Sequence, residues 1–520
     1  MIAENTKYTL PEGWIWTTLD LVSKNITDGS HNPPGKQDSG IPMLSARNIE
    51  NGKITFDEVR YISESDYAYE NQRARIEAGD VLLTIVATIG RSAIISTPIQ
   101  QRFALQRSVA AIKPLINGFF LMYVFQSPEF QKLLTDNAKG TGQKGVYLKT
   151  LRELPIPLPP LPEQYRIVAK IEELFSELDH AEVELKKSQK QLKVYRQAML
   201  KSAFEGKMTE KWRIENSVSL SDWYNVNLGD IVTIIRGASP RPAGDRRFFG
   251  GNIPWITVGE ITKDEKKILT KVSTFLTEIG KKHSRFIEKG TLLLTNSGAT
   301  LGVPKISMID GCINDGSVAF PDIANEILKN YLYWFLNSQT KILRQINQGA
   351  GQPNLNTQIV KDIIVPYPSS YEQVQIVQEL ETRFTLIENL ENSIDDGLRK
   401  IGLFRQSILR RAFEGKLVPQ DKNDKPATTL LKLISQEKET YMLNQKMISK
   451  GKPIKKKPME KRKTIKEILG ESKNPINSER LWRESIHCDN IEEFYAELKK
   501  MEHEIEILFE GKESSIFLKI

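Results

Sequence analysis

The sequence Asn32-Pro33-Pro34 is the first group of residues in this chain whose types and spacing could do chemistry. Amino-methyltransferases use an Asn-Pro-Pro-aromatic signature to hold the target amine, and the aromatic ring stacks on the flipped base. The fourth position here is Gly35, which has no ring, and no glycine-rich strand–turn–helix for S-adenosylmethionine precedes it. A Pro-Pro loop is therefore the better interpretation.

Other catalytic patterns are also incomplete. One stretch partly resembles a nuclease motif through Asp322, Glu326 and Lys329. In that motif the last two residues form Glu-x-Lys, and here they are one residue too far apart. The string GTGQKG at 140–145 lacks the Gly-Lys-Ser/Thr ending of a phosphate loop. The five histidines are scattered, and no Cys/His cluster has metal-ligand spacing. We expect no catalytic residue, no metal and no cofactor in this chain itself.

The composition is that of a soluble globular protein of three to four domains. The chain has 520 residues, of which 39% are hydrophobic and 27% charged. It contains no apolar run of about 18 residues that could span a membrane, and its N-terminus lacks an apolar signal region. Two cysteines, Cys312 and Cys488, fit a reducing compartment. We therefore expect a cytoplasmic protein, and the net charge of +8 permits a polyanionic partner.

The elements that must position any site occur twice. Residues 163–207 contain EQYRIVAKIEELF and VYRQAMLKSAFEGK, and residues 372–416 contain EQVQIVQELETRF and LFRQSILRRAFEGK. All these matches fall at one offset of 209 residues, without insertion or deletion. Weaker matches continue upstream at offsets of 209 to 212, so loops differ in length there. The chain is therefore expected to run as variable domain, helix, variable domain, helix and unrepeated tail.

Each variable domain combines β-rich runs with turn residues. VLLTIVATIG at 81–90 and TLLLTNSGAT at 291–300 are rich in Val, Ile, Leu and Thr and contain glycine. The stretch at 330–346 has a helical pattern. These features predict a small α/β domain in each copy.

The two repeated stretches predict long helices with matching apolar seams. Prolines at 155–162 prevent the first helix from starting earlier, while Gly206 and Gly415 stand where helices stop. About 40 residues make a helix of roughly 60 Å. Such a helix cannot hide its seam against one small domain, so we expect the two copies to pack antiparallel; a plain dimerisation coiled coil is the alternative. The expected seam is Ile167, Ile171, Leu174, Leu178, Ala181, Leu185, Leu192, Tyr195 and Met199, with Ile376, Leu380, Ile387, Leu390, Ile394, Ile401, Phe404 and Ile408 in the second copy.

At this point the residues carry a family resemblance. LPEGWIWTTL at 10–19, LPPLPEQ at 158–164 and AFEGK at 203–207 and 412–416 resemble the specificity subunit of type I restriction–modification systems. The resemblance covers about 410 residues. It implies an α+β fold with two tandem α/β target recognition domains, two long helices in an antiparallel intramolecular coiled coil, and here also a small C-terminal winged-helix-like module. The expected boundaries are 1–160 and 208–369 for the recognition domains, 161–207 and 370–416 for the spacer helices, 417–463 for a helix and basic linker, and 464–520 for the module.

The resemblance also implies a function. Each recognition domain would bind one half of a bipartite, asymmetric site in double-stranded DNA, and the subunit itself would be non-catalytic. The helices would set the spacer and dock two modification subunits, which carry S-adenosylmethionine and methylate adenine. Restriction subunits, with ATP and Mg, would complete the nuclease. The rivals are a self-sufficient methyltransferase or nuclease, and a stand-alone DNA-binding or scaffold protein.

Positions that differ between the matched loops are candidates for base recognition. The loop at 28–40 in the first copy corresponds to the loop at 236–251 in the second copy, and the loop at 140–147 corresponds to 349–356. Arg can bind guanine bidentately, although solvated loop charges or phosphate contacts are alternatives for each residue. The candidates are His31, Lys36, Lys144 and Tyr147 in the first copy and Arg241, Arg246, Arg247, Asn354 and Asn356 in the second. Residues that both copies share are expected to be structural or to face phosphate: Gly140, Gly142, Gln143, Gly349, Gly351 and Gln352.

The tail lies outside the repeat. We expect a helix from about 427 to 445 and then a flexible linker at 446–466, which holds ten Lys or Arg against one Glu and could also add unspecific DNA affinity. Residues 464–520 predict three short helices and a hairpin, as in a winged helix. Glu502, Glu504 and Glu506 are expected to make the second half of the third helix acidic, which favours contact with protein over DNA.

Overall fold

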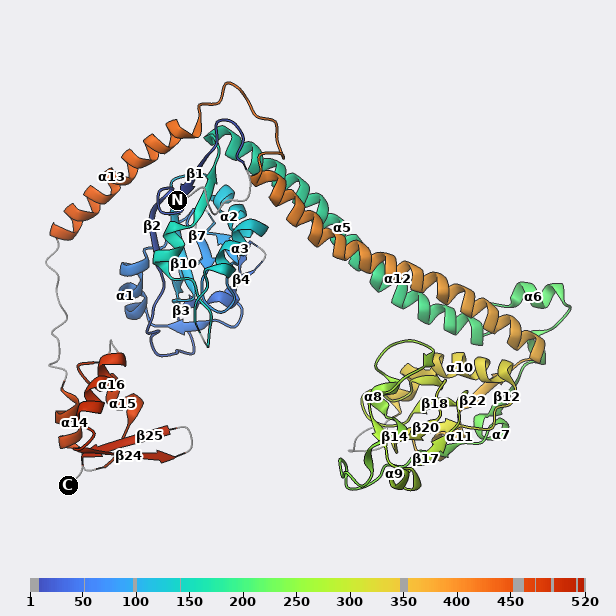
Figure 1. Ribbon diagram of the computed structural model, residues 1–520. Coiled ribbons are helices and arrows are strands. Elements are labelled where there is room, and N and C mark those ends of the chain that lie inside the picture. Colours follow the sequence, from blue (N-terminus) through green and yellow to red (C-terminus); the bar gives the residue numbers. More distant parts are fainter. Residues whose placement is uncertain are drawn as a thin grey trace. The chain divides into compact units, whose positions relative to one another are not determined.

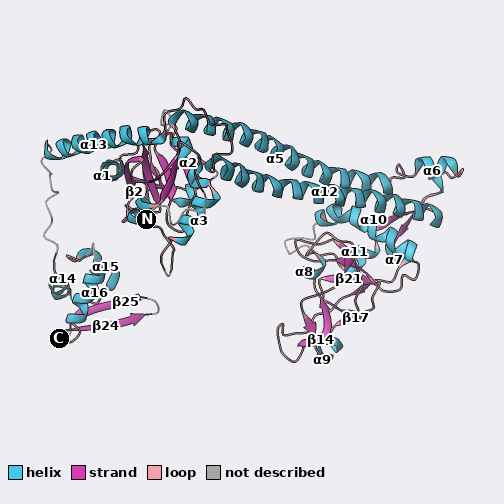
Figure 2. Ribbon diagram, turned by 45° about the horizontal axis from the view of Figure 1, so that its top comes forward, coloured by secondary structure: helices cyan, strands magenta, loops and turns pink. Residues whose placement is uncertain are grey.

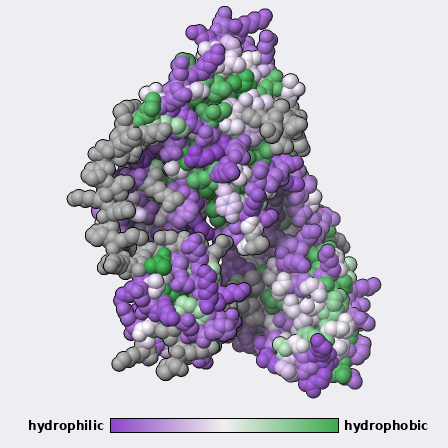
Figure 3. Space-filling view, turned by 60° about the vertical axis from the view of Figure 1, so that its left-hand side comes forward, coloured by the Kyte–Doolittle hydropathy of each residue, from purple (hydrophilic) through white to green (hydrophobic). Residues whose placement is uncertain are grey.

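The computed structural model describes residues 9–50, 52–96, 101–140, 142–346, 354–451, 463–472, 474–487, 491–510 and 513–518. The chain forms two compact units, 1–430 and 431–520. We use variable domain 1 for residues 1–160 and variable domain 2 for residues 208–369. No helix of the described residues is long and apolar enough to cross a membrane. The face in Figure 3 is mostly hydrophilic, with hydrophobic side chains in small separate patches.

Variable domain 1 is built on two small sheets (Figure 1). The first is antiparallel and has the strand order β2 (Ser23–Asp28), β10 (Val109–Pro114), β7 (Val81–Thr84) and β8 (Ser92–Ile94). The second has the order β6 (Arg60–Ile62), β3 (Ile41–Leu44) and β9 (Ala104–Leu105), and two short ladders join β1 (Ile15–Thr18) to β11 (Pro155–Leu158) and β4 (Ile49–Glu50) to β5 (Lys53–Ile54). The helices are η2 (Ala46–Asn48), α1 (Glu64–Ala74), α2 (Gly118–Gln126), α3 (Pro128–Asp136) and α4 (Leu148–Glu153).

Variable domain 2 repeats this plan with longer loops. Its first sheet has the order β13 (Ile235–Arg236), β21 (Ser317–Phe320), β18 (Leu292–Thr295), β19 (Pro304–Ser307) and β15 (Ile268–Leu269). Its second has the order β16 (Phe275–Leu276), β14 (Phe249–Ile256), β20 (Gly311–Ile313) and β17 (Arg285–Ile287), and β12 (Tyr224–Asn227) pairs with β22 (Ile364–Tyr367). The helices are α6 (Glu210–Glu215), η3 (Leu220–Asp222), α7 (Leu228–Ile231), α8 (Val258–Ile261), α9 (Glu278–Lys282), α10 (Glu326–Gln345) and α11 (Thr357–Lys361).

The central strands explain why the sequence runs predicted at 81–90 and 291–300 are so apolar. All four residues of β7 and all four of β18 are buried, because each strand has sheet neighbours on both edges and packed side chains on both faces. Each of the two strands ends in a Thr, after which the chain turns. The predicted α/β class is confirmed for both domains.

Two helices of 44 residues each, α5 (Leu161–Phe204) and α12 (Ser370–Phe413), lie side by side in Figures 1 and 2. Gln189 donates a hydrogen bond to Asp395 over 3.2 Å. Further along α5, Arg196 pairs with Glu391 at 2.6 Å. Because the partner's number falls as the number along α5 rises, the helices are antiparallel, as predicted.

The contacts between the helices obey an internal twofold symmetry. Arg196 lies over the ring of Phe384, and Arg405, 209 residues later, lies over Phe175. Arg405 also pairs with Glu182 at 3.5 Å, as Arg196 does with Glu391. The repeat in the sequence is therefore a repeat of three-dimensional contacts.

Most of the predicted seam lies between the helices. Ile167 and Ile171 are buried, while Leu178, Leu185 and Leu192 are half-buried. Five of the eight second-copy residues are buried: Ile376, Leu380, Ile387, Ile394 and Ile401. The prediction was wrong for Leu390 and Phe404, whose side chains are about half exposed, and for Ala181, which is exposed. Tyr195 is also about half exposed, but it lies at the edge of the seam, where it hydrogen-bonds Arg383 of α12. A pair of helices buries only one stripe on each, so residues at the edge of the heptad pattern face solvent.

The helix ends are formed as predicted. Gly206 has a φ of 75° and Gly415 a φ of 68°, the left-handed conformation in which glycine ends helices without strain. Residues 415–427 then lie against the start of the chain, where Ala427 donates to the carbonyl of Gly13 over 2.9 Å. Both halves of the repeat thus belong to one connected unit.

The second unit has the connectivity of a winged helix. α14 (Ile465–Glu471), β23 (Ile476–Asn477), α15 (Ser478–Glu484), α16 (Ile491–Lys500), β24 (Ile505–Glu510) and β25 (Glu513–Leu518) follow one another, and the sheet order is β23-β25-β24. Glu502 and Glu504 lie in the turn after α16 and Glu506 on β24, so the expected acidic half of the third helix is wrong; α16 ends in two lysines.

The helix before it, α13, spans Ala427–Gly451 and is longer than expected. It includes residues 446–451 of the segment that we expected to be a flexible linker. Residues 452–462 of that segment lie outside the described residues.

Candidate nucleic-acid interface

The sheet topology brings the candidate loops of variable domain 1 to one end of its first sheet. β2 ends at Asp28, which pairs with Ala110, and β7 ends at Thr84, which pairs with Val109 at the start of β10. The loops that follow β2 and β7 and the turn that precedes β10 must therefore leave from the same sheet end. Fixed strands thus present these loops together.

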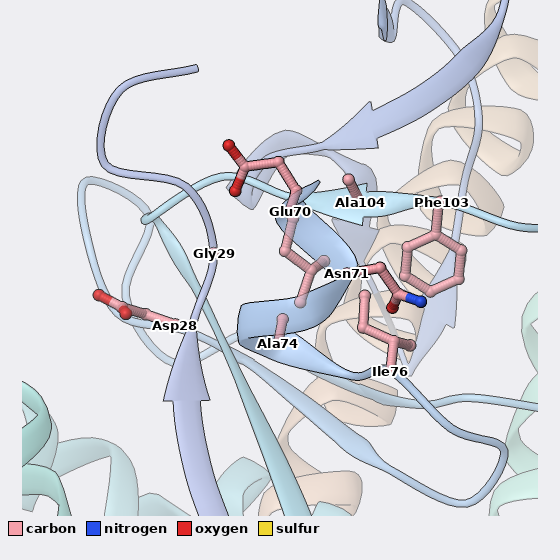
Figure 4. A pocket seen from close by; sticks show the side chains of 9 residues that line it. Asp28, Gly29, Glu70, Asn71, Ala74, Ile76, Phe103 and Ala104 are labelled. Atoms are coloured by element: carbon pink, nitrogen blue, oxygen red, sulfur yellow. The ribbon is translucent and has the colours of Figure 1, made fainter. Parts of the chain in front are cut away.

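The start of the 28–40 loop passes close to the neighbouring backbone. A Cβ on Gly29 would lie 2.1 Å from the carbonyl oxygen of Leu105, so only glycine fits there. Ser30 accepts a bond from the amide of Arg107 over 2.9 Å and donates from its hydroxyl to Glu70 of α1 over 2.8 Å. A narrow gap lies beside Gly29 and Glu70, and Figure 4 shows the side chains that line it. The gap has no room for a water molecule. It is packing and not a ligand pocket.

Beyond Gly29 the loop carries its two candidates at the surface. The imidazole of His31 is half exposed and lies 2.6 Å from the carboxylate of Asp28. Lys36 is exposed. Both side chains are accessible, and His31 is held by its neighbour.

The second loop packs on the turn after β7. Ala87 donates its amide to the carbonyl of Lys144, and Gly145 forms a bridge with Val86. The side chains of Lys144 and Tyr147 are free of this contact and exposed, Tyr147 by 65%. Both candidate loops of this domain therefore meet at one sheet end.

The shared residues of this loop have different roles. Gly140 has a φ of 127°, and a Cβ there would lie 2.5 Å from the carbonyl oxygen of Gln143, so its role is structural. A Cβ on Gly142 would meet nothing within 4 Å, and Gln143 is exposed. Gly349, Gly351 and Gln352 lie outside the described residues.

Variable domain 2 holds its first candidate loop in the same way. A Cβ on Gly237 would lie 2.0 Å from the carbonyl oxygen of Asn314, matching the position of Gly29. Further on, the carbonyl of Phe248 accepts from the amide of Thr277 over 2.9 Å, and the ring of Phe248 packs on His283. The loop is therefore fixed against α9 and the residues that follow it.

The three candidate arginines of this loop differ in how they are held. Arg247 is paired through several hydrogen bonds with Asp245, and this pairing lowers the pKa of that carboxyl. Arg241 pairs with Asp315 at 3.1 Å but is largely exposed. Arg246 is exposed and forms no ion pair with another described residue. Arg246 is consequently the most available to a new partner.

The two candidate asparagines lie beside the turn after β18. Asn354 forms a bridge with Ser297, and its side-chain oxygen is buried without a hydrogen-bond partner among the described residues. Asn356 caps α11, where its side chain accepts from the amide of Ile359 over 2.9 Å. The cap gives Asn356 a structural role, since its oxygen satisfies a helix N-terminus.

The structure adds basic residues that the loop comparison missed. Arg107 is exposed and its backbone contacts the 28–40 loop, while Lys281, Lys282 and Arg285 lie on or just after α9, which packs on the 236–251 loop. The run KKHSR at 281–285 was a visible signal in the sequence. Its proximity to the arginine loop follows only from the fold. Within the described ranges no group of three or more His, Cys, Asp or Glu could hold a metal.

Each helix begins with a buried glutamate that joins it to its variable domain. Glu163 accepts from the indole of Trp14 over 2.9 Å, and Glu372 accepts from Trp223 over 2.7 Å, again 209 residues apart. Glu372 is also paired with buried Arg213 at 2.5 Å. Glu163 forms no ion pair with a described cation, and one of its oxygens lacks a hydrogen-bond partner in the described structure. Burial raises the pKa of Glu163, although the nearby charge of Arg166 opposes this rise.

Comparison with known proteins identifies this arrangement. Residues 29–190 and 220–396 both match the model of the type I restriction modification DNA specificity domain. The chain belongs to this family. The two matches cover the two variable domains and run on into both long helices.

Several specificity subunits are similar to this chain, two of the three described here along most of their length. The chain is 24% identical over 438 residues to the type I restriction enzyme EcoKI specificity subunit of Escherichia coli, covering 80% of this chain and 92% of that one. It is 25% identical over 445 residues to the EcoBI specificity subunit of the same species, covering 81% and 90%. It is 31% identical over 188 residues to the MjaIX specificity subunit of Methanocaldococcus jannaschii, covering 35% and 42%.

Solved structures share the fold. The specificity-subunit structure (HsdS) from Thermoanaerobacter tengcongensis is 21% identical with a TM-score of 0.51, covering 79% of this chain and 99% of that one. A chain from a structure on complex assembly and conformational transition of the type I R-M system is 21% identical with a TM-score of 0.60, covering 79% and 100%. This protein is thus a type I specificity subunit with two DNA-recognition domains.

Proposed function

We propose that each variable domain binds one half of a bipartite, asymmetric DNA site, that the subunit has no catalytic activity of its own, and that α5 and α12 set the spacer between the half-sites. The observation that carries this proposal is the pair of equivalent loop platforms, at Gly29 and at Gly237, which carry different exposed side chains. Equal scaffolds with different surface residues suit two different half-site sequences, whereas identical surfaces would suit a palindrome.

The test is the adenine methylation of the host genome, measured by long-read sequencing with and without this gene. We expect the deletion to remove methylation at one gapped two-part motif. An unchanged methylome in cells that express the gene would contradict the proposal. In the assembled system, S-adenosylmethionine would be bound by the modification subunits, and ATP and Mg by the restriction subunits.

A substitution in one loop should affect one half-site only. Replacing Arg246, which forms no ion pair with another described residue, with Ala should weaken binding by roughly 10- to 100-fold, because a bidentate contact to guanine contributes about 1–3 kcal/mol. Competition binding with site variants should show relaxed specificity at one position of the second half-site. Lys36→Ala is the matched variant for the first half-site. Equal weakening on all sequences would show that Arg246 contacts phosphate instead.

The exposed apolar residues of the helices support docking of two copies of one modification subunit. Val194 and Tyr195 are exposed by 70% and 48%, and their equivalents Leu403 and Phe404 by 67% and 54%. Exposed apolar side chains at equivalent positions of both helices give two similar contact surfaces, which suit two identical partners.

Charge placed on these surfaces should remove the partners separately. Tyr195→Glu should leave one modification subunit bound instead of two, Phe404→Glu should do the same, and the double variant should lose both, because a carboxylate cannot be desolvated at an apolar contact without large cost. Native mass spectrometry measures the stoichiometry. Lys190→Glu, an exposed position on the same helix, is the control. Two bound subunits in the double variant would exclude these surfaces.

A further inference from the structure

Three residues of the 236–251 loop converge on one residue of the neighbouring turn, Asp315. The hydroxyl of Ser239 donates to one oxygen of the Asp315 carboxylate over 2.6 Å, and Nη2 of Arg241 donates to the other oxygen over 3.1 Å. The Nε of Arg236 donates to the backbone carbonyl of Asp315 over 3.2 Å. The amide of Asp315 in turn donates to the hydroxyl of Ser239 over 3.3 Å. The carboxylate is thus held at a fixed position relative to the loop.

Asp315 lies at the sheet end that presents the candidate loops of variable domain 2. It precedes β21, whose first residue Ser317 pairs with Thr295, the last residue of β18. The 236–251 loop begins against the same turn, because the amide of Gly237 donates to the carbonyl of Ser317 over 2.9 Å. The carboxylate therefore stands where the loops leave the sheet.

Arg241 is held by this carboxylate without being covered. Its side chain is 80% exposed, and Nη2 is the only one of its side-chain nitrogens that bonds another described residue. Nε and Nη1 keep hydrogens that can be donated to a ligand. An exposed ion pair contributes little to stability, so stability does not account for the three contacts on Asp315. A guanidinium whose direction is already fixed loses less conformational freedom when it binds.

The free donors of Arg241 match one class of ligand on DNA. Guanine presents two acceptors, O6 and N7, in the major groove, and a guanidinium can bind both at once. Such a fork binds both atoms only when it is correctly turned, so a carboxylate that fixes its direction adds specificity. Although burial opposes the change, the hydrogen bonds from Ser239 and Arg241 lower the pKa of Asp315. The carboxylate is therefore ionised near neutral pH and disfavours a phosphate beside Arg241.

Variable domain 1 has a different arrangement at the equivalent place. The turn residue equivalent to Asp315 is Gln106, because each directly follows the residue whose carbonyl approaches the loop glycine. The carboxylate in variable domain 1 is instead Asp28 at the end of β2, and it holds the imidazole of His31. A carboxylate thus fixes an imidazole in one domain and a guanidinium in the other. Different fixed groups at equivalent sheet ends suit two different half-sites.

We propose that Arg241 binds a guanine in the half-site of variable domain 2, and that Asp315 is the positioning residue that directs its guanidinium toward that base. The inference rests on the proposed function, which it deepens by naming the base and the residue pair that recognises it. Asp315 acts through Arg241, and it was absent from the candidates that the loop comparison gave.

Competition binding of the assembled modification complex to DNA randomised in the half-site of variable domain 2 tests both roles. Arg241→Ala should weaken binding to the native site by roughly 10- to 100-fold and remove the preference for guanine at one position. Asp315→Ala should reduce the preference at that same position by roughly 2- to 10-fold, because the guanidinium loses its fixed direction. Asp315→Asn should restore most of the preference, since its amide oxygen can still accept from Arg241.

Two controls belong to this experiment. Asp322→Ala removes an exposed carboxylate just beyond the opposite end of β21 and should leave the preference at every position unchanged. In a chain that already carries R241A, Asp315→Ala should have no further effect at the guanine position, because a positioning residue acts only through the residue that it holds. An unchanged preference at the half-site of variable domain 1 shows that each variant is folded.

The outcomes separate this inference from the function beneath it. Loss of preference at several positions after Asp315→Ala, without rescue by Asn, would show that Asp315 only shapes the loop and would overturn its positioning role. Equal weakening on all sequences after Arg241→Ala would show a phosphate contact and would overturn the inference. In both cases the unaltered complex would still prefer a two-part site, so the proposed function would stand. An unaltered complex that prefers no two-part site would contradict the proposed function together with the inference.

Discussion

Inserting one heptad into both long helices should change the spacer of the DNA site and leave both half-sites unchanged. The matched insertion points are between 185 and 186 in α5 and between 396 and 397 in α12, because the side chain of Leu185 lies against Gly397. Seven residues lengthen each helix by about 10.5 Å, which corresponds to roughly three base pairs at 3.4 Å each. Seven residues also bring the seam back to within about 20° of its former direction.

Binding to a library with fixed half-sites and a varied spacer measures this effect. The original site should be bound much more weakly than by the unaltered protein, and the best site should have a spacer about three base pairs longer. At about 10.5 base pairs per turn, three base pairs also rotate one half-site by roughly 100° about the duplex axis. Because this rotation turns the half-site away from its recognition domain, binding to the new site should be weaker than the original interaction. A heptad in α5 alone is the control, since it leaves seven residues without a partner in α12. A changed half-site sequence, or an unchanged spacer, would contradict the proposal that the two long helices set the spacer.

The second large effect is a contrast between two equivalent glutamates. Glu372→Gln should destabilise the junction of α12 by about 3 kcal/mol or more, because it leaves the buried guanidinium of Arg213 without its carboxylate. Glu163→Gln should change the stability little, or raise it near neutral pH, because Glu163 is buried without an ion-pair partner among the described residues. The amide oxygen of Gln still accepts the bond from Trp14.

Calorimetry of the two variants tests this contrast. A loss of 3 kcal/mol corresponds to a fall in the unfolding temperature of roughly 3 °C for a cooperative unit of 430 residues. The two glutamates differ because only Glu372 has an arginine partner. The residue 209 positions after Arg213 is Lys422, and its side chain is exposed. Equal effects of the two substitutions would contradict the assignment.

The same contrast predicts a pH dependence. Because the pKa of Glu163 is raised in the folded state, its contribution to stability is complete below the pKa of an unfolded glutamate. That contribution is lost as the pH rises through the raised value. The unaltered protein should therefore lose part of its stability over this range, and Glu163→Gln should abolish that part. An identical pH profile for both proteins would show that Glu163 does not titrate there.

The sequence by itself determined the architecture of the first 416 residues. The offset of 209 residues predicted two equal domains and two equal helices, and Gly206 and Gly415 predicted where the helices stop. These predictions succeeded because a strict heptad pattern and a glycine in the left-handed region are local properties of the chain. The prediction of an acidic third helix in the tail was wrong because the end of that helix is not a local property. The helix ends at Lys500, where packing within the small unit turns the chain into β24.

The tertiary structure alone decided which side chains can act together. Only strand pairing brings the loops after β2 and β7 to one sheet end, and only the packing of α9 places Lys281 and Lys282 beside the arginine loop. Only the fold also shows that Asn356 serves as a helix cap and that the side chain of Phe404 is half exposed instead of buried in the seam. Contacts between residues far apart in the chain depend on how elements pack, and no periodicity along the sequence records that.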